Sequence, residues 1–183
     1  AVAKHPNTPS ETLKKLFKDT HLTVRRAAVE NPTLNSETLI KIADFTSDLA
    51  TLRNVSRNPN TPAELLEKLA NHSDIYILSS VAAHSSTPSV TLNTLANHDL
   101  LNVCQIVALN PNTPIETLQL LAAASVDIRK YVAANPTLPA PMLLELATDE
   151  AVDVREYVAC NPLVSIKILE QLSDDVDDNV RYC

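Results

Sequence analysis

Arginines recur at one fixed place in the repeating pattern of this 183-residue chain. They are Arg25, Arg129, Arg155 and Arg181, and the column is interrupted by Leu52, Leu78 and Cys104. A continuous row would suit phosphate or carboxylate recognition, because guanidinium presents paired N–H donors. The interruption, and the acids Asp127 and Asp153 two residues before their arginines, favour ion pairs within or between repeats. Arg129 and Arg155 remain candidate contacts for a protein partner.

Histidine and aspartate share a second recurrent position. Its members are His72, His98, Asp19, Asp149 and Asp175. A metal site needs three or four ligands converging within a few Å. One whole repeat separates the two histidines, so polar residues at helix ends explain the position better. We predict no metal site.

No nucleophile is paired with a base. The three cysteines, Cys104, Cys160 and Cys183, are scattered singly and lack an identifiable histidine partner. An odd number without paired spacing fits a reducing cytosol better than a disulfide framework. Cys104 lies in an apolar run and is interpreted as a small buried hydrophobe. We expect no enzymatic activity and a cytoplasmic location.

Composition excludes several classes. The chain contains no glycine, which rules out Rossmann and P-loop phosphate sites. A net charge of −7 argues against nucleic acid as the main partner. The charge is uneven: residues 1–57 hold nine Lys and Arg against six Asp and Glu, and residues 126–183 hold five against eleven. The acidic run at 174–178 reads as a solvated face, with a calcium-binding loop as the weaker alternative. No segment suggests a membrane span or a signal peptide.

Seven polar residues divide the chain at intervals of 25 to 27 residues, and six of them precede a proline. These marks are His5, Asn31, Asn58, His84, Asn110, Asn135 and Asn161. The regularity predicts one repeat array over residues 1–183, with partial repeats at both ends, as expected of a piece excised from a longer array. The marks are interpreted as a buried ladder that satisfies backbone groups between repeats.

Each repeat begins with an amphipathic helix. Leucine or isoleucine recurs eight and eleven residues after the mark, which places both on one helix face. Leu66, Leu69, Leu118 and Leu121 are examples. The following column is mostly small, except at Phe17, and permits close helix packing. These residues are the predicted core.

Helix ends carry capping signals. In the fifth repeat Thr113 is the expected N-cap, with Pro114 at the first helical position and Glu116 closing a capping box. A second segment of about two turns ends at the next X-Pro step. It must be stabilised by neighbours, and its choice between α and 3₁₀ geometry stays open. Its expected N-caps are Asp127, Asp153 and Asn179.

The middle of the chain is nearly uncharged. Residues 73–125 contain only three charged side chains, and Ile75, Tyr76, Ile77 and Leu78 form an apolar run where other repeats place polar residues. The run is either additional core or an exposed contact patch for a protein partner. The sequence does not decide between these two interpretations.

The repeat can be written V-R-x-x-V-A-x-N-P-x-T-P-x-x-L-L-x-x-L-A-x-D. Ile128, Arg129, Val132, Ala133, Asn135, Pro136, Leu143, Leu146, Ala147 and Asp149 match it. The pattern resembles the leucine-rich repeat variant family. That resemblance implies an all-α, right-handed superhelical solenoid of alternating α and 3₁₀ helices without β-sheet. The best-known relative carries an iron–sulfur cluster on an additional cysteine-rich segment, which has no counterpart in residues 1–183, so no cofactor is expected.

Such a solenoid presents an extended surface, and the expected function is binding of a protein or peptide. One alternative is a nucleic-acid-binding helical repeat, which would need a basic stripe and salt-dependent binding. Another is an accessory domain of an iron–sulfur redox protein. The partner's identity and the oligomeric state are left open.

Overall fold

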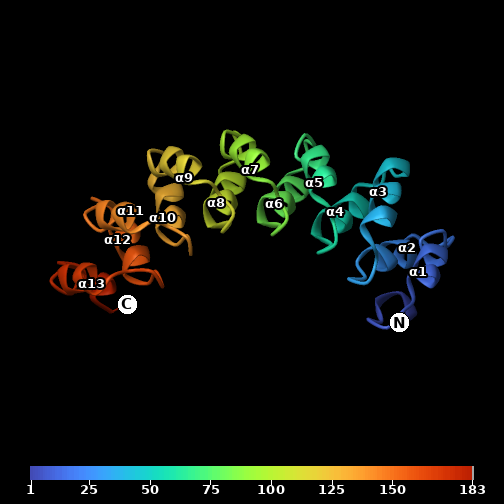
Figure 1. The fold of residues 1–183 in the computed structure, drawn as a ribbon, viewed down its shortest axis with the longest axis horizontal. Coiled ribbons are helices and arrows are strands. Elements are labelled where there is room, and N and C mark those ends of the chain that lie inside the picture. Colours follow the sequence, from blue (N-terminus) through green and yellow to red (C-terminus); the bar gives the residue numbers. More distant parts are fainter. Residues whose placement is uncertain (183) are drawn as a thin grey trace. The chain divides into compact units, whose positions relative to one another are not determined.

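The computed structural model describes residues 1–182, which form helices joined by short turns and contain no β-strand (Figure 1). First helices of the repeats are α1 (Ser10–Leu16), α3 (Ser36–Phe45), α5 (Ala63–Leu69), α7 (Ser89–Ala96), α9 (Ile115–Ala122), α11 (Ala140–Leu146) and α13 (Ile166–Ser173). Second helices are α2 (Leu22–Val29), α4 (Leu49–Arg57), α6 (Ile75–Ala83), α8 (Leu101–Leu109), α10 (Val126–Ala133), α12 (Val152–Ala159) and α14 (Asp178–Tyr182). The predicted all-α array of two-helix repeats is confirmed.

Contacts divide the chain into two compact units, Ala1–Thr91 and Leu92–Cys183. Within each unit, second helices pack on one another: α2 on α4 and α4 on α6, and likewise α8 on α10, α10 on α12 and α12 on α14. A first helix packs on the second helix that follows it, as α3 does on α4 and α11 on α12. In each unit, first helices therefore lie on one side and second helices on the other (Figure 1). The single array over residues 1–183 stays a prediction.

The core lies between the two helices of each repeat. Most side chains eight and eleven residues after the marks are buried, including Leu66, Leu69, Leu118 and Leu121, whereas Leu16 is half-buried and Leu169 is 40% exposed. Each fully buried leucine contributes about 1.5–3 kcal/mol relative to an exposed one. Because most repeats add the same buried pair, the stack is stabilised by many small contributions rather than by one large core.

Turns between repeats need no glycine. The N–H three residues after each mark donates to the mark's carbonyl, as from Thr61 to Asn58 at 2.9 Å and from Thr113 to Asn110 at 3.1 Å. Asparagine followed by proline is a favoured start for such a β-turn, because proline presets φ at the second position. No described residue has a positive φ.

The capping box predicted at Thr113 is wrong. Helix α9 begins at Ile115 with Pro114 as its N-cap, and no side chain caps it. The Thr113 hydroxyl instead donates to the Val107 carbonyl at 2.6 Å. The X-Pro step ends α8, so the Val107 carbonyl has no i+4 N–H donor; it accepts the Asn110 N–H at 3.1 Å and keeps a second lone pair for the Thr113 hydroxyl. The hydroxyls of Thr8, Thr61 and Thr87 make the same bond.

For the second helices, the structure answers one question that the sequence left open and corrects one expectation. From α2 to α12 they are α-helical, and 3₁₀ geometry within residues 1–182 is confined to the segment η1 (Val2–Lys4). Eight or nine residues packed against neighbours suffice for regular i→i+4 bonding. Asp127 and Asp153 lie in the first turns of α10 and α12 rather than at their N-caps, which are Ser125 and Ala151.

Candidate functional site

The asparagine marks form a buried hydrogen-bonded ladder between repeats. The Asn58 amide donates to the carbonyls of Val29 at 2.7 Å and Asn31 at 3.1 Å, both in the preceding repeat. Its Oδ1 accepts the N–H of Asn60 at 3.0 Å. Asn31, Asn135 and Asn161 repeat this arrangement, and Asn110 accepts the N–H of Asn112. The side chains therefore satisfy backbone groups at helix ends, and those of Asn31, Asn58, Asn135 and Asn161 join their repeat to the one before it.

Histidine fits the same ladder at His84. Its Nε2 lies 2.9 Å from the Asn58 carbonyl, and its Nδ1 accepts the N–H of Ser86 at 3.0 Å. These partners require the neutral tautomer with the proton on Nε2, which donates as an asparagine amide does. Histidine at this mark is therefore a structural replacement for asparagine.

Arg129 and Arg155 are held in ion pairs that link consecutive repeats. Arg129 donates two hydrogen bonds of 2.8 and 3.0 Å to the carboxylate of Asp149. Arg155 donates two of 2.6 and 2.9 Å to that of Asp175. The remaining Nη1 donates to a loop carbonyl, that of Ala124 for Arg129 and of Asp149 for Arg155. Both pairs are largely buried. Their donors are thus used within the chain.

These pairs perturb the carboxylates. The hydrogen bonds from Arg155 hold the pKa of Asp175 below its usual value. Burial acts to raise the pKa of Asp149, but hydrogen bonds from Arg129 and the Ala151 N–H outweigh it, so that this pKa is also lowered. The charged form of each carboxylate is therefore the one that the fold stabilises.

A second series of ion pairs joins α2 to α4 and α4 to α6. Arg26 pairs with Asp48, and Arg53 pairs with Asp74 at 2.6 Å. Asp48 and Asp74 are also the N-caps of α4 and α6. The Arg53 guanidinium, whose carbon lies 4.4 Å from the ring centroid of Tyr76, stacks on that ring as well.

The histidine–aspartate column caps backbone groups. The Nδ1 atoms of His72 and His98 accept the N–H of Asp74 and of Leu100, at 2.9 and 3.1 Å. Asp149 accepts the N–H two residues ahead in the same way. Within residues 1–182, no group of three or more His, Cys, Asp or Glu is placed to hold a metal ion.

Cys104 lies at the repeat position that carries arginine elsewhere, and like Arg25 it donates to a loop carbonyl. It is buried, and its Sγ lies 3.2 Å from the His98 carbonyl, the place where Arg25 reaches the Asp19 carbonyl. Burial raises the pKa of the Cys104 thiol, which keeps it protonated and unreactive.

The prediction that the cysteines are unpaired is wrong for Cys160, which is disulfide-bonded. Spacing along the sequence cannot reveal a pairing that the fold creates. The inference of a reducing compartment therefore loses this support. Cys183 lies outside the described residues. No helix among residues 1–182 has the length and apolar character that crossing a membrane would require.

The apolar run in the middle of the chain divides between core and surface. Ile77 and Leu78 are buried, whereas Ile75 and Tyr76 are 39% and 54% exposed. The run lies at the start of α6, whose periodicity turns alternate pairs inward. Of these four residues, only Ile75 and Tyr76 could contribute to a contact patch, and Tyr76 also lines a hollow of about 480 Å³ that includes Arg57 and Ala83.

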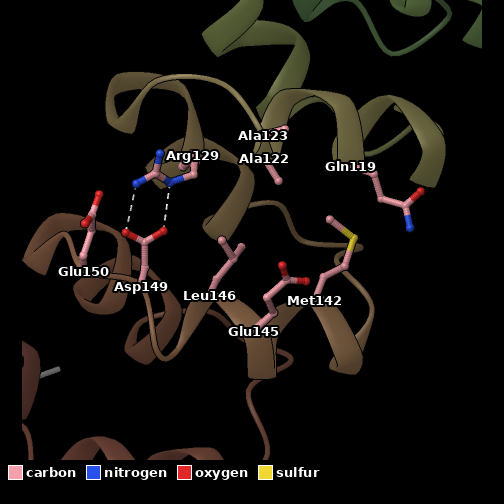
Figure 2. A pocket seen from close by; sticks show the side chains of 9 residues that line it. All are labelled: Gln119, Ala122, Ala123, Arg129, Met142, Glu145, Leu146, Asp149 and Glu150. Carbon is pink, nitrogen blue, oxygen red and sulfur yellow. Dashed lines mark hydrogen bonds and ion pairs between the residues drawn. The ribbon is translucent and has the colours of Figure 1, made fainter.

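Hollows open on the side of the first helices. One of about 640 Å³ lies between α9 and α11. Its lining residues are Gln119, Ala122, Ala123, Arg129, Met142, Glu145, Leu146, Asp149 and Glu150. Figure 2 shows Met142 and Leu146 pointing from α11 toward α9, with the paired Arg129 and Asp149 at one end. The small Ala122 and Ala123 leave the space open.

The same hollow recurs between other first helices. Between α1 and α3 it measures about 460 Å³. We number positions in a repeat by their distance from its mark, so that position 9 lies nine residues after the mark. Both hollows are lined by positions 9, 12 and 13 of one repeat and by positions 7, 10, 11 and 14 of the next. A smaller hollow of about 200 Å³ lies between α3 and α5, where Lys68 pairs with Asp44 at 2.6 Å. The sequence predictions missed this row, because hollows depend on how neighbouring helices splay.

Equivalent positions in these hollows carry different chemistry. Position 10 of the second contributing repeat is Lys41 in the α1/α3 hollow and Glu145 in the α9/α11 hollow. Position 13 of the first is Lys18 in one and Ala123 in the other. The row therefore combines constant geometry with variable charge.

Comparison with known proteins supports the repeat assignment. The family model for the leucine rich repeat variant matches residues 126–151, which include α10, α11 and the Arg129–Asp149 pair. A solved structure described as "a leucine-rich repeat variant with a novel repetitive protein structural motif" is similar, with a TM-score of 0.64 and 28% identity, over 95% of this chain and 69% of that chain. Comparison with curated proteins finds no match. The resemblance to the family is confirmed.

Proposed function

We propose that this chain, whose repeats are of the leucine-rich repeat variant type, is a non-catalytic binding module that accepts protein or peptide segments in the hollows between its first helices. The recurrence of one hollow at equivalent positions, lined by different side chains, carries the proposal. Helical-repeat proteins bind along extended surfaces built in this way.

Separation of structural from variable positions supports this function. The marks from Asn31 to Asn161 and most of the core leucines are buried and nearly invariant in type from repeat to repeat, because each rung depends on the previous one. The hollow positions contribute little to that stack and can change without unravelling it. A surface of this kind can be adapted to a partner at low cost in stability.

A protein partner is favoured over a nucleic acid. Binding to phosphates requires a surplus of available Lys and Arg, but the net charge is −7, and Arg129 and Arg155 are held by Asp149 and Asp175. A hollow with an apolar floor and charged rim instead suits one side chain of a peptide flanked by polar residues.

Selection from a phage library of random 12-residue peptides on the immobilised chain tests the proposal. Lys18→Trp and Ala123→Trp fill the two larger hollows from equivalent positions, and Asp127→Trp, on exposed surface of α10, is the matched control. Each selected peptide should lose at least about tenfold in affinity for one filled variant and keep its affinity for the control. If no peptide is selected, or if all three variants bind equally, the proposal is wrong.

A further inference from the structure

The α1/α3 hollow has an exposed aromatic rim that the fold does not require. Both phenylalanines of the chain, Phe17 and Phe45, line it, and Phe45 is 88% exposed. Phe45 lies in the one 27-residue repeat, where α3 reaches ten residues, more than any other first helix. The additional residue thus places a large exposed apolar side chain beside the other apolar side chains of the hollow, and a contiguous apolar patch of this kind is typical of a contact site.

The rim is also basic. Lys14, Lys18 and Lys41 surround the phenylalanines. Lys14 and Lys41 pair with Glu11 and Glu37, but those pairs are exposed. Exposed ion pairs are weak, so an incoming carboxylate can exchange with them. The hollow therefore suits an apolar side chain with acidic neighbours.

A segment of that chemistry occurs in the same chain. The turn between α13 and α14 reads Asp174, Asp175, Val176, Asp177, Asp178, and Val176 is 92% exposed. The residue at the equivalent position, 15 after the mark, is polar in each of the other repeats and is exposed in all of them except at the half-buried Thr46. Asp175 is ion-paired with Arg155. Asp174 and Asp178 are exposed, and neither forms an ion pair with another of residues 1–182.

We propose that the 174–178 turn of one copy docks in the α1/α3 hollow of a second copy. Val176 enters between Phe17 and Phe45, and Asp174 and Asp178 approach the lysines. Two features identify the occupant. The turn and the hollow carry opposite charge, and each presents an exposed apolar side chain, Val176 or Phe45, that is unusual at its position in the repeat. The inference rests on the proposed function in treating the hollow as a docking site, and it adds self-association.

The contact joins two different surfaces, so it is heterologous. A pair keeps one unused hollow, on one copy, and one unused turn, on the other, so association can continue beyond two unless a ring closes. One side chain and a few exposed ion pairs make a small interface, so we expect a dissociation constant on the order of 100 μM. Salt should weaken it, because the Debye length falls from about 10 Å at 0.1 M to about 3 Å at 1 M.

Sedimentation velocity of the full chain between about 10 μM and 1 mM, in low and high salt, measures this association. The sedimentation coefficient should rise with concentration in low salt and return toward the monomer value in high salt. Phe45→Ser and Val176→Ser should each abolish the rise. Leu120→Ser, which removes a 47% exposed leucine elsewhere, is the matched control and should leave it unchanged.

Charge exchange makes the test specific. Lys18→Glu with Lys41→Glu gives a chain with an acidic hollow and an acidic turn. Asp174→Lys with Asp178→Lys gives one with a basic hollow and a turn whose two exposed acids are replaced by lysines. Each double variant alone should remain monomeric, and an equimolar mixture should associate, while circular dichroism verifies their helicity.

A monomeric wild-type chain at 1 mM, or a mixture that stays monomeric, would overturn the proposal. If the chain remains monomeric while selected peptides still lose affinity for Lys18→Trp, self-docking is wrong and the proposed function stands. If an acidic peptide fills the α1/α3 hollow but copies do not associate, the occupant is a separate partner and self-docking is again wrong.

Discussion

Replacing Asn58 with alanine tests whether the buried ladder holds the repeats together. Asn58 is 2% exposed, and its side chain makes three hydrogen bonds, two to carbonyls of the preceding repeat and one from the Asn60 N–H. A buried polar group left without its partner costs about 1–3 kcal/mol. The Asn31 carbonyl retains its bond from the Leu34 N–H, which lessens its loss. We therefore expect a decrease of about 3–5 kcal/mol in unfolding free energy.

Asn60→Ala is the matched control. The Asn60 amide also donates to two carbonyls of the preceding repeat, those of Pro32 at 2.6 Å and Leu34 at 2.9 Å, but Asn60 is exposed. Water can replace those bonds, so the loss should stay below about 1 kcal/mol. Urea unfolding followed by circular dichroism at 222 nm measures both variants. If Asn58→Ala and Asn60→Ala differ by less than about 1 kcal/mol, the ladder does not stabilise the stack as argued.

Three further predictions address other parts of the repeat. Hydrogen bonding from Arg53 lowers the pKa of Asp74 from 3.8 to about 2. The stability that this pair contributes is therefore complete above pH 4 and is lost as the pH falls toward 2. Asp74→Asn keeps a capping side chain, and urea titrations at several pH values should show a smaller loss of stability between pH 4 and pH 2 for this variant. Thr113→Val removes one of the two donors to the Val107 carbonyl, which keeps the Asn110 N–H, and should cost about 1 kcal/mol; no change by chemical denaturation would contradict the reassigned role of the hydroxyl. Leu121→Ala should cost about 2–5 kcal/mol and lower helicity beyond its own repeat; a loss confined to α9 would argue against cooperative stacking.

The stack itself could be predicted from the sequence, because it depends on local patterns that repeat. The interval between marks gives the repeat, the Asn-Pro step gives the turn, and the leucine spacing gives the core face. Asn58 could be recognised as buried and structural because a polar side chain at a helix end has backbone groups to satisfy. The Arg–Asp pairs could be anticipated in kind, although not that Arg129 reaches Asp149 rather than the nearer Asp127.

Features that depend on spacing between helices could not be predicted. Thr113 has the right sequence context for an N-cap, and only the position of the Val107 carbonyl decides otherwise. The hollows arise because second helices pack on one another while first helices stand apart. Two signals for the α1/α3 hollow were present, namely Phe17 in a column of small residues and the 27-residue interval that contains Phe45, but neither indicated that they meet.

The most direct test of the central claim is to map a selected peptide on the chain by two-dimensional ¹H–¹⁵N NMR. The account predicts that amide shifts change in pairs of consecutive first helices, such as α1 with α3 or α9 with α11, at the hollow positions of each. Changes confined to second helices or to the turns that carry the marks would contradict it, because binding would then use the structural side of the repeat.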